Sequence, residues 1–192
     1  MKKFSSKEVL VPSVSLFVIS LVVTLLLAVT NNITAPLIEK LSVETEIQTR
    51  KTVLADASYF DDKDKTVTLD GTEYTYCVGL DAENNVVGYI FTTSTKGYGG
   101  EVKVMTGVSA DGKVTGVEAL ALSETAGLGM NAQKESFRNQ YIGKSGKIGV
   151  AKNSPKENEI QALTGATITS SAFTDAVNIA LELYSLVTGG VK

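Results

Sequence analysis

An uncharged stretch near the start of the chain constrains most strongly what the protein can fold into. No Asp, Glu, Lys or Arg occurs between residues 9 and 38, and residues 10–29 provide the ~20 mainly apolar positions that a helix needs to cross a bilayer. The stretch is longer than the ~7–15 apolar residues of a signal peptide. Neither a clear small-x-small cleavage site nor a lipid-accepting cysteine follows it. We therefore predict that residues 1–33 form a cytoplasmic N-terminus and a retained transmembrane anchor.

The charges at the N-terminus predict the direction of this anchor. Lys2, Lys3 and Lys7 precede it, and positive residues beside a membrane helix favour the cytoplasmic side. We therefore expect a single crossing of the cell (inner) membrane, with the N-terminus in the cytoplasm and the long C-terminal part outside it. The net charge is −3, with +2 in residues 1–8 and therefore −5 in the rest. This acidic balance argues against a nucleic-acid partner, whereas membrane lipid is an expected one.

The composition excludes several kinds of chemistry. The chain has no histidine, no tryptophan and one cysteine, Cys77. Catalysis by Ser–His or Cys–His pairs and histidine-rich metal sites are therefore excluded. A single cysteine can form neither an internal disulfide nor a CxxC pair, and it cannot hold an iron–sulfur cluster. Because Cys77 lies in the strand-like segment EYTYCVGL, we interpret it as a small buried apolar residue.

The pattern of turns and apolar residues predicts an α+β domain behind a helical stalk. Residues 34–57 have helical character, and residues 58–192 are expected to form the extracytoplasmic domain. Four or five antiparallel strands are predicted first, joined by hairpins at Asp70-Gly71 and at residues 110–113. Two helices are predicted after them, over residues 131–143 and from residue 169 to about 187. Strands followed by helices indicate an antiparallel sheet with flanking helices rather than a doubly wound fold.

Two glycine-rich segments are candidates for ligand contacts. GLGMNA begins at Gly127 and fits G-x-G-x-x-[GA], but it follows no strand of a βαβ unit, so we interpret it as a loop with Asn131 capping the next helix. KGYGGEV, over residues 96–102, connects two predicted strands. Its glycines let other groups approach the backbone, and Tyr98 could either stack on a planar ligand or cover the edge of the core.

A hydroxyl-rich stretch before the last helix is the third candidate. QALTGATITSSAFTDAV, residues 161–177, has five Ser or Thr residues within eight positions around Gly165 and Ala166. The N-terminal end of a helix offers free N–H groups and a partial positive charge, which suit a phosphate. The physics leaves two readings open, a phosphate site or an ordinary capped helix, and it does not select one hydroxyl.

These three segments resemble motifs of one family. LTGATITSSA is similar to the [ST]-G-A-T motif of flavin mononucleotide (FMN)-binding domains in membrane electron-transfer complexes. SETAGLG resembles the E-T-P-G-L-G loop of these domains, and GYGG matches a further family segment. The motifs occur in the family order behind one anchor, and the length most resembles the G subunit of the Rnf complex, an ion-translocating ferredoxin:NAD oxidoreductase. The C subunit of the sodium-translocating NADH:quinone reductase is related.

The resemblance implies a cofactor and the residues around it. FMN would be attached by a phosphoester to Thr167, Thr164 and Thr169 would surround the phosphate, and the two glycine-rich loops would line the ring. The residues expected at the flavin are Thr164, Gly165, Ala166, Thr167, Thr169, Glu124, Thr125, Gly127, Leu128, Gly129, Tyr98, Gly99 and Gly100. The family pattern has an acid where this chain has Gln161, in a motif read by the flavin transferase.

The resemblance also implies a function and partners. The chain would be a redox subunit that relays electrons through FMN, with no catalytic or metal-binding residue and no substrate turnover of its own. Its partners would be the other membrane subunits and, during maturation, the flavin transferase. The alternatives are a C subunit of the quinone reductase or a stand-alone extracytoplasmic flavin carrier. A different class of function also stays open, an anchored binding module without a covalent cofactor.

Overall fold

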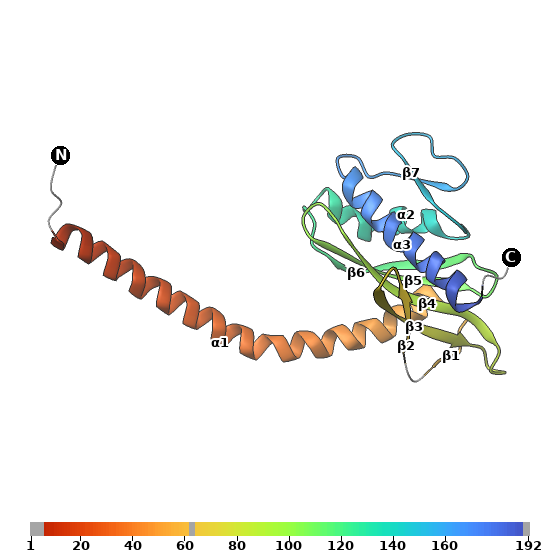
Figure 1. Cartoon of the computed structure of the whole chain (residues 1–192), viewed down its shortest axis with the longest axis horizontal. Helices are drawn as coiled ribbons and strands as arrows, with labels where there is room; N and C mark the ends of the chain where they lie inside the picture. The colour runs from red at the N-terminus through yellow and green to blue at the C-terminus, as the bar shows by residue number, and fades with distance from the viewer. Residues whose placement is uncertain (1–5, 62–63, 190–192) are drawn as a thin grey trace. The chain divides into compact units, whose positions relative to one another are not determined.

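The computed structural model describes residues 6–61 and 64–189, and Figure 1 shows the order of their elements. The chain forms two compact units, Met1–Thr45 and Glu46–Lys192. Helix α1 (Ser6–Val53) is one helix of 48 residues. Within it, Leu10–Ala35 has a mean hydropathy of 2.6. These 26 residues extend about 39 Å as a helix, so by length and composition this part of α1 can cross a membrane.

The stalk predicted from residue 34 is a continuation of the same helix. The hydroxyl of Thr34 donates a hydrogen bond to the carbonyl of Thr30, as it does inside a helix, and it marks no new start. The last turns of α1 belong to the second compact unit, which begins at Glu46. The folded unit therefore begins twelve residues before the boundary expected at residue 58.

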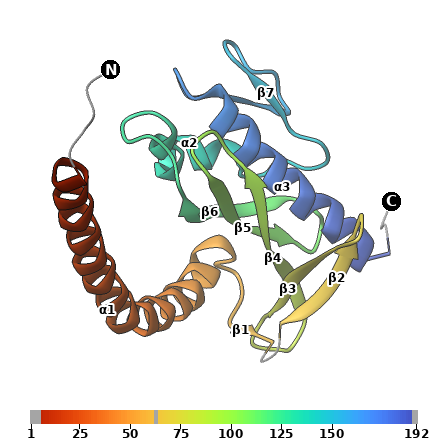
Figure 2. The ribbon, with the colours of Figure 1, turned by 60° about the vertical axis from the view of Figure 1, so that its left-hand side comes forward.

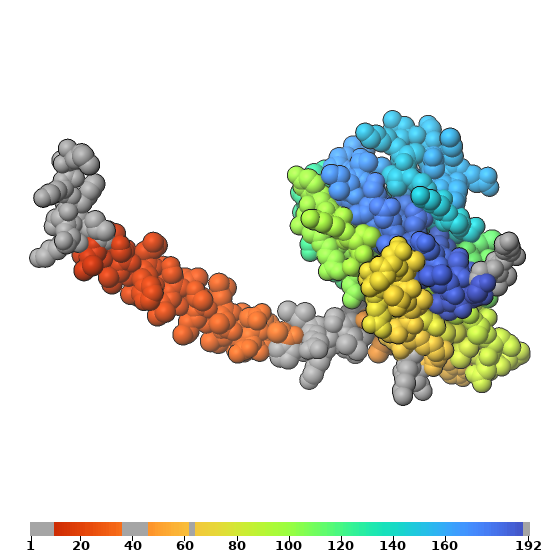
Figure 3. Space-filling model, in the orientation of Figure 1, coloured from red at the N-terminus to blue at the C-terminus, as the bar shows by residue number. Residues whose placement is uncertain are grey.

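A six-stranded antiparallel sheet forms the centre of the second unit. Its order is β1-β3-β4-β5-β6, and β2 pairs with β3. Both predicted hairpins are present, with positive φ at Asp70, Gly71 and Gly112. Figure 3 shows the β2–β3 hairpin against the last helix. The strands are β1 (Tyr59–Phe60), β2 (Lys65–Leu69), β3 (Thr72–Leu80), β4 (Val86–Lys96), β5 (Glu101–Ser109) and β6 (Val114–Leu122).

Helix α3 (Thr167–Val187) crosses one face of this sheet, as Figure 2 shows. Its buried side chains join those of β4, β5 and β6 in the main core, where Phe173 and Val177 are fully buried. Two strand hydroxyls reach the helix backbone, because Thr93 and Thr95 donate hydrogen bonds of 2.9 and 2.7 Å to carbonyls of α3. The sheet therefore fixes the direction of α3.

The end of α1 packs in a second core with Cys77. Val53 and Leu54 are each 1% exposed and contact Ile90 and Met105 as well as Cys77. Cys77 is itself buried and free, as predicted. Close approach needs glycine here, because a Cβ on Gly107 of β5 would lie 2.2 Å from the carbonyl oxygen of Val53.

The segment between β6 and α3 is less regular than predicted. The helix expected over residues 131–143 is wrong, because an extended Lys134 (φ −71°, ψ 139°) separates two short helices. Asn131 caps neither, and its amide donates to the carbonyl of Gly127 instead. A parallel strand pair follows, which the sequence did not predict. The elements are η1 (Gly129–Gln133), α2 (Glu135–Arg138), η2 (Asn139–Tyr141), β7 (Gly149–Ala151) and β8 (Glu159–Gln161).

Candidate functional site

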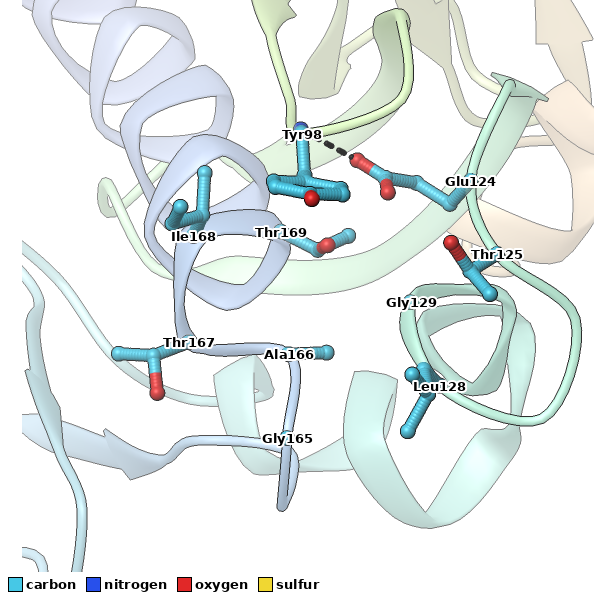
Figure 4. Close-up of a pocket in the computed structure, with 10 residues that line it drawn as sticks. All are labelled: Tyr98, Glu124, Thr125, Leu128, Gly129, Gly165, Ala166, Thr167, Ile168 and Thr169. Carbon is cyan, nitrogen blue, oxygen red and sulfur yellow. Dashed lines mark hydrogen bonds between the residues drawn. The ribbon is translucent and has the colours of Figure 1, made fainter.

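The three motif segments meet around one cavity, shown in Figure 4. Its volume is about 470 Å³, within the range of small-molecule sites. The β4–β5 loop, the loop after β6 and the start of α3 all contribute to its wall. The lining residues are Tyr98, Glu124, Thr125, Leu128, Gly129, Gly165, Ala166, Thr167, Ile168 and Thr169.

Nine of the thirteen residues expected from the sequence line this cavity, and four do not. Ile168 is the additional lining residue, and it lies between two residues that were expected. The signal available in the sequence was a single apolar residue within a hydroxyl-rich stretch. The residues outside the lining are Thr164, Gly99, Gly100 and Gly127.

Glu124 holds the two glycine-rich loops together. Its carboxylate accepts hydrogen bonds from the backbone N–H groups of Tyr98 (2.8 Å) and Gly99 (3.2 Å). Gly97 permits this approach, since a Cβ there would lie 2.2 Å from a carboxylate oxygen of Glu124. A Cβ on Gly99 would lie 2.4 Å from the carbonyl oxygen of Ser123. The glycines of this loop are therefore explained by the contact between the loops.

The start of α3 has no side-chain cap despite the hydroxyls around it. The N-cap residue is Ala166, and no side chain bonds to the first N–H groups of the helix. Ser170 is occupied elsewhere, because its hydroxyl donates to the carbonyl of Ala166 and accepts from the N–H of Leu163. An α-helix leaves its first N–H groups without intrahelical acceptors. These donors, at the cavity wall, can therefore bind an anion.

The threonine hydroxyls of this stretch differ in their surroundings. Thr167 is exposed and lines the cavity, whereas Thr164 is exposed outside it. Thr169 is 1% exposed and also lines the cavity. None of these three hydroxyls forms a hydrogen bond with a residue that the structure describes. Figure 4 shows Thr169 on the same side of the helix start as Glu124, and Thr167 pointing the other way. Thr167 is therefore the hydroxyl that combines exposure with a place at the cavity.

Apolar side chains surround the cavity opening. Tyr98, Leu128 and Ile168 are 73%, 43% and 57% exposed, and each comes from a different one of the three segments. Such side chains can contact a planar ring, while the helix start binds an anionic group. Within the described ranges, no group of three His, Cys, Asp or Glu could hold a metal ion. The apolar side chains and the free N–H groups of the helix start therefore fit a planar ligand with a phosphate group.

Comparison with family models finds the FMN-binding domain over residues 97–182. This range contains GYGG, SETAGLG and LTGATITSSA, and the whole cavity wall. The prediction of an antiparallel FMN-binding fold behind an apolar N-terminal helix is confirmed.

Three relatives align with most of the chain, and each is the G subunit of its complex. That of the Na(+)-translocating ferredoxin:NAD(+) oxidoreductase complex of Acetobacterium woodii is 42% identical and covers 88% of both chains. That of the proton-translocating complex of Clostridium ljungdahlii is 34% identical and covers 86% of both. That of the ion-translocating oxidoreductase complex of Methanosarcina acetivorans is 32% identical over 96% of this chain and 98% of its own.

Two solved structures share the fold. The C subunit of the Na(+)-translocating NADH-quinone reductase from Parabacteroides distasonis has a TM-score of 0.53 and 22% identity, over 62% of this chain and 64% of its own. NqrC of Shewanella oneidensis has a TM-score of 0.54 and 18% identity, over 70% of each chain. At these identities the likeness concerns the fold.

Proposed function

The chain belongs to the family of G subunits of ion-translocating ferredoxin:NAD(+) oxidoreductase complexes, and on that premise we propose that it is the electron-transfer flavoprotein subunit of such a complex. It relays electrons through one FMN, which is attached by a phosphoester to Thr167. It turns over no substrate alone, because the redox chemistry belongs to the bound flavin.

The exposure of Thr167 and its place on the cavity wall are the observation that supports this proposal. It is an exposed hydroxyl on the wall of a cavity of about 470 Å³, at a helix start without a side-chain cap. A transferase must reach from solvent the hydroxyl that it esterifies, which excludes the buried Thr169 and Ser170. Thr164 is reachable but lies outside the cavity lining. Thr167 alone among these hydroxyls meets both conditions.

The other residues would bind and orient the cofactor. The free N–H groups of α3 would stabilise the negative charge of the phosphodiester, and the unpartnered hydroxyl of Thr169 would donate to an acceptor on the ligand. Tyr98, Leu128 and Ile168 would contact the ring with their exposed apolar surfaces. Glu124 would position Tyr98 by accepting hydrogen bonds from the backbone of the loop that carries it. FMN, when bound, supplies the reversible uptake of electrons.

The remaining partners follow from the anchor and from the family. The apolar part of α1 would cross the membrane once and contact lipid, with the N-terminus in the cytoplasm because of its lysines. The flavin unit would then lie outside the cytoplasm and contact other membrane subunits of the complex. A flavin transferase would form the bond to Thr167. The relatives from A. woodii and C. ljungdahlii carry Na(+) and proton in their names, so the proposal includes no particular ion.

Intact mass of the purified full chain tests the covalent bond. Coexpression with an active flavin transferase is expected to add the mass of FMN minus one water, and the denatured chain should give a fluorescent band on a gel. The Thr167→Val variant should lose both signals, while Thr68→Val, a matched control at an exposed threonine of β2 outside the cavity lining, should keep them. A wild-type chain without flavin under these conditions would refute the relay and support an anchored binding module without a covalent cofactor.

A further inference from the structure

A second hollow borders the start of α3. It has a volume of about 270 Å³ and is lined by Lys96, Thr167, Ile168, Ser171, Ala172 and Asp175. Thr167 and Ile168 line the first cavity as well, so the two spaces meet at these residues. In Figure 4 the Thr167 side chain points away from Thr169 and Glu124. Because Thr167 lines both spaces, a group bonded to its hydroxyl oxygen begins beside the second hollow as well as the first.

The two spaces that Thr167 lines contain two acids, Glu124 and Asp175, and one cation, Lys96. A third hollow of about 410 Å³ lies beside the end of β4 and includes Lys96 and Glu101, which are opposite each other in the β4–β5 register. The residues that line the three spaces include the acids Glu124, Asp175 and Glu101, and one cation, Lys96. Lys96 forms no ion pair with any residue that the structure describes.

We propose that Lys96 is the counter-ion of the phosphate group on Thr167, and thus a positioning residue of the flavin site. The inference rests on the proposed function, because it requires a phosphate at Thr167. A phosphodiester on Thr167 adds a negative charge beside two spaces whose walls already hold the carboxylates of Glu124 and Asp175, and like charges repel. The ammonium group of a lysine is a compact charge on a flexible stem, so it can follow the phosphate. Lys96 would fix the start of the flavin chain beside Thr167.

Labelling of amines in the full chain tests this directly. Acetic anhydride would be applied to flavin-loaded and flavin-free wild type, and the labelled lysines counted by peptide mass. Lys96 labelling is expected to fall about fivefold in the loaded chain, the factor that corresponds to roughly 1 kcal/mol of ion pairing. Lys103 on β5, which lines none of the three spaces, should react equally in both forms.

Salt separates an ion pair from steric cover by the flavin. At 1 M salt the screening length is about 3 Å, so the protection of Lys96 should largely disappear. Protection that persists at this salt concentration would overturn the proposal, because cover by the flavin body does not depend on salt. Equal labelling of Lys96 in the loaded and flavin-free chains would overturn it as well.

Variants give a second readout. Lys96→Gln is expected to slow the initial rate of flavin attachment about fivefold, while Lys96→Arg and the control Lys103→Gln should load at the wild-type rate. A Lys96→Gln chain that loads at the wild-type rate would overturn the inference. A wild-type chain that never carries flavin would overturn the proposed function together with this inference, whereas equal labelling in a loaded chain would overturn the inference alone.

Discussion

Removal of the end of α1 should destabilise the flavin unit. A fragment of residues 58–192, the boundary expected from the sequence, lacks Val53 and Leu54, which are each 1% exposed. Full burial of such a side chain contributes ~1.5–3 kcal/mol, so the pair contributes ~3–6 kcal/mol. The Thr115 hydroxyl would also lose its acceptor, the carbonyl of Val53, which costs about 1 kcal/mol. The total loss of ~4–7 kcal/mol is comparable with the ~5–15 kcal/mol stability of a whole domain.

Urea unfolding of two fragments measures this loss. We expect the fragment of residues 46–192 to unfold cooperatively and the fragment of residues 58–192 to have a much lower midpoint. Cys77, which shares a core with Val53 and Leu54, should react rapidly with a thiol reagent only in the shorter fragment. As a control, Ile47→Ala in the longer fragment should change stability by less than ~0.5 kcal/mol, because Ile47 is 52% exposed. Equal midpoints and an equally protected Cys77 in both fragments would contradict this account of the second core.

Four further predictions concern single side chains. Glu124→Ala removes the acceptor of two backbone N–H groups. The free energy of unfolding should fall by ~1.5–3 kcal/mol, and the variant should attach flavin more slowly. An unchanged melting temperature would contradict the role of Glu124. Thr95→Val removes the bond to the Ala172 carbonyl and should cost about 1 kcal/mol, with faster hydrogen exchange in the first turns of α3 than in wild type. Ala166→Ser places a capping hydroxyl at the N-cap and should stabilise the flavin-free chain by ~0.5–1 kcal/mol. The hydroxyl should also compete with the phosphate for the N–H groups, so the fraction of chains that carry flavin, measured by intact mass, should fall. Burial raises the pKa of the Cys77 thiol, so the thiol deprotonates more readily in the unfolded chain. The free energy of unfolding should therefore fall as pH rises above ~8.5. Urea titrations at several pH values should show this fall in wild type and not in Cys77→Ala.

The sequence predicted elements whose signals are local. Asp70-Gly71 marks a hairpin because few other residues accept positive φ at both positions, and the structure has the turn there. The apolar pattern of α3 is similarly clear, although the helix begins at Thr167 rather than near residue 169. The helix predicted over residues 131–143 is absent. Phe137 and Tyr141 are buried by tertiary contacts, so burial rather than helix propensity determines the short helices η1, α2 and η2.

Long-range contacts were not predictable from one chain. The docking of Val53 on Gly107 joins residues far apart in sequence, and nothing local in the end of α1 indicates it. The same holds for the bonds from Glu124 to Tyr98 and Gly99, which a reading of separate motifs does not reveal. The order of three motifs predicted nine of the residues that line the cavity. The contacts between the loops depend on the fold, which brings Glu124 next to the backbone of Tyr98 and Gly99.

The start of α3 combines an abundance of capping residues with the absence of a cap. Ser and Thr at the N-cap stabilise a helix by ~1 kcal/mol relative to Ala, and this stretch has five of them, yet Ala166 stands at the N-cap. The deficit is tolerated because Thr93 and Thr95 hold α3 on the sheet and its buried face supplies most of its stability. A bound phosphate would satisfy the same N–H groups that a cap would otherwise occupy. The uncapped start and the exposed hydroxyl of Thr167 therefore fit one arrangement, in which the helix keeps its N–H donors available for the anion that we propose Thr167 to carry.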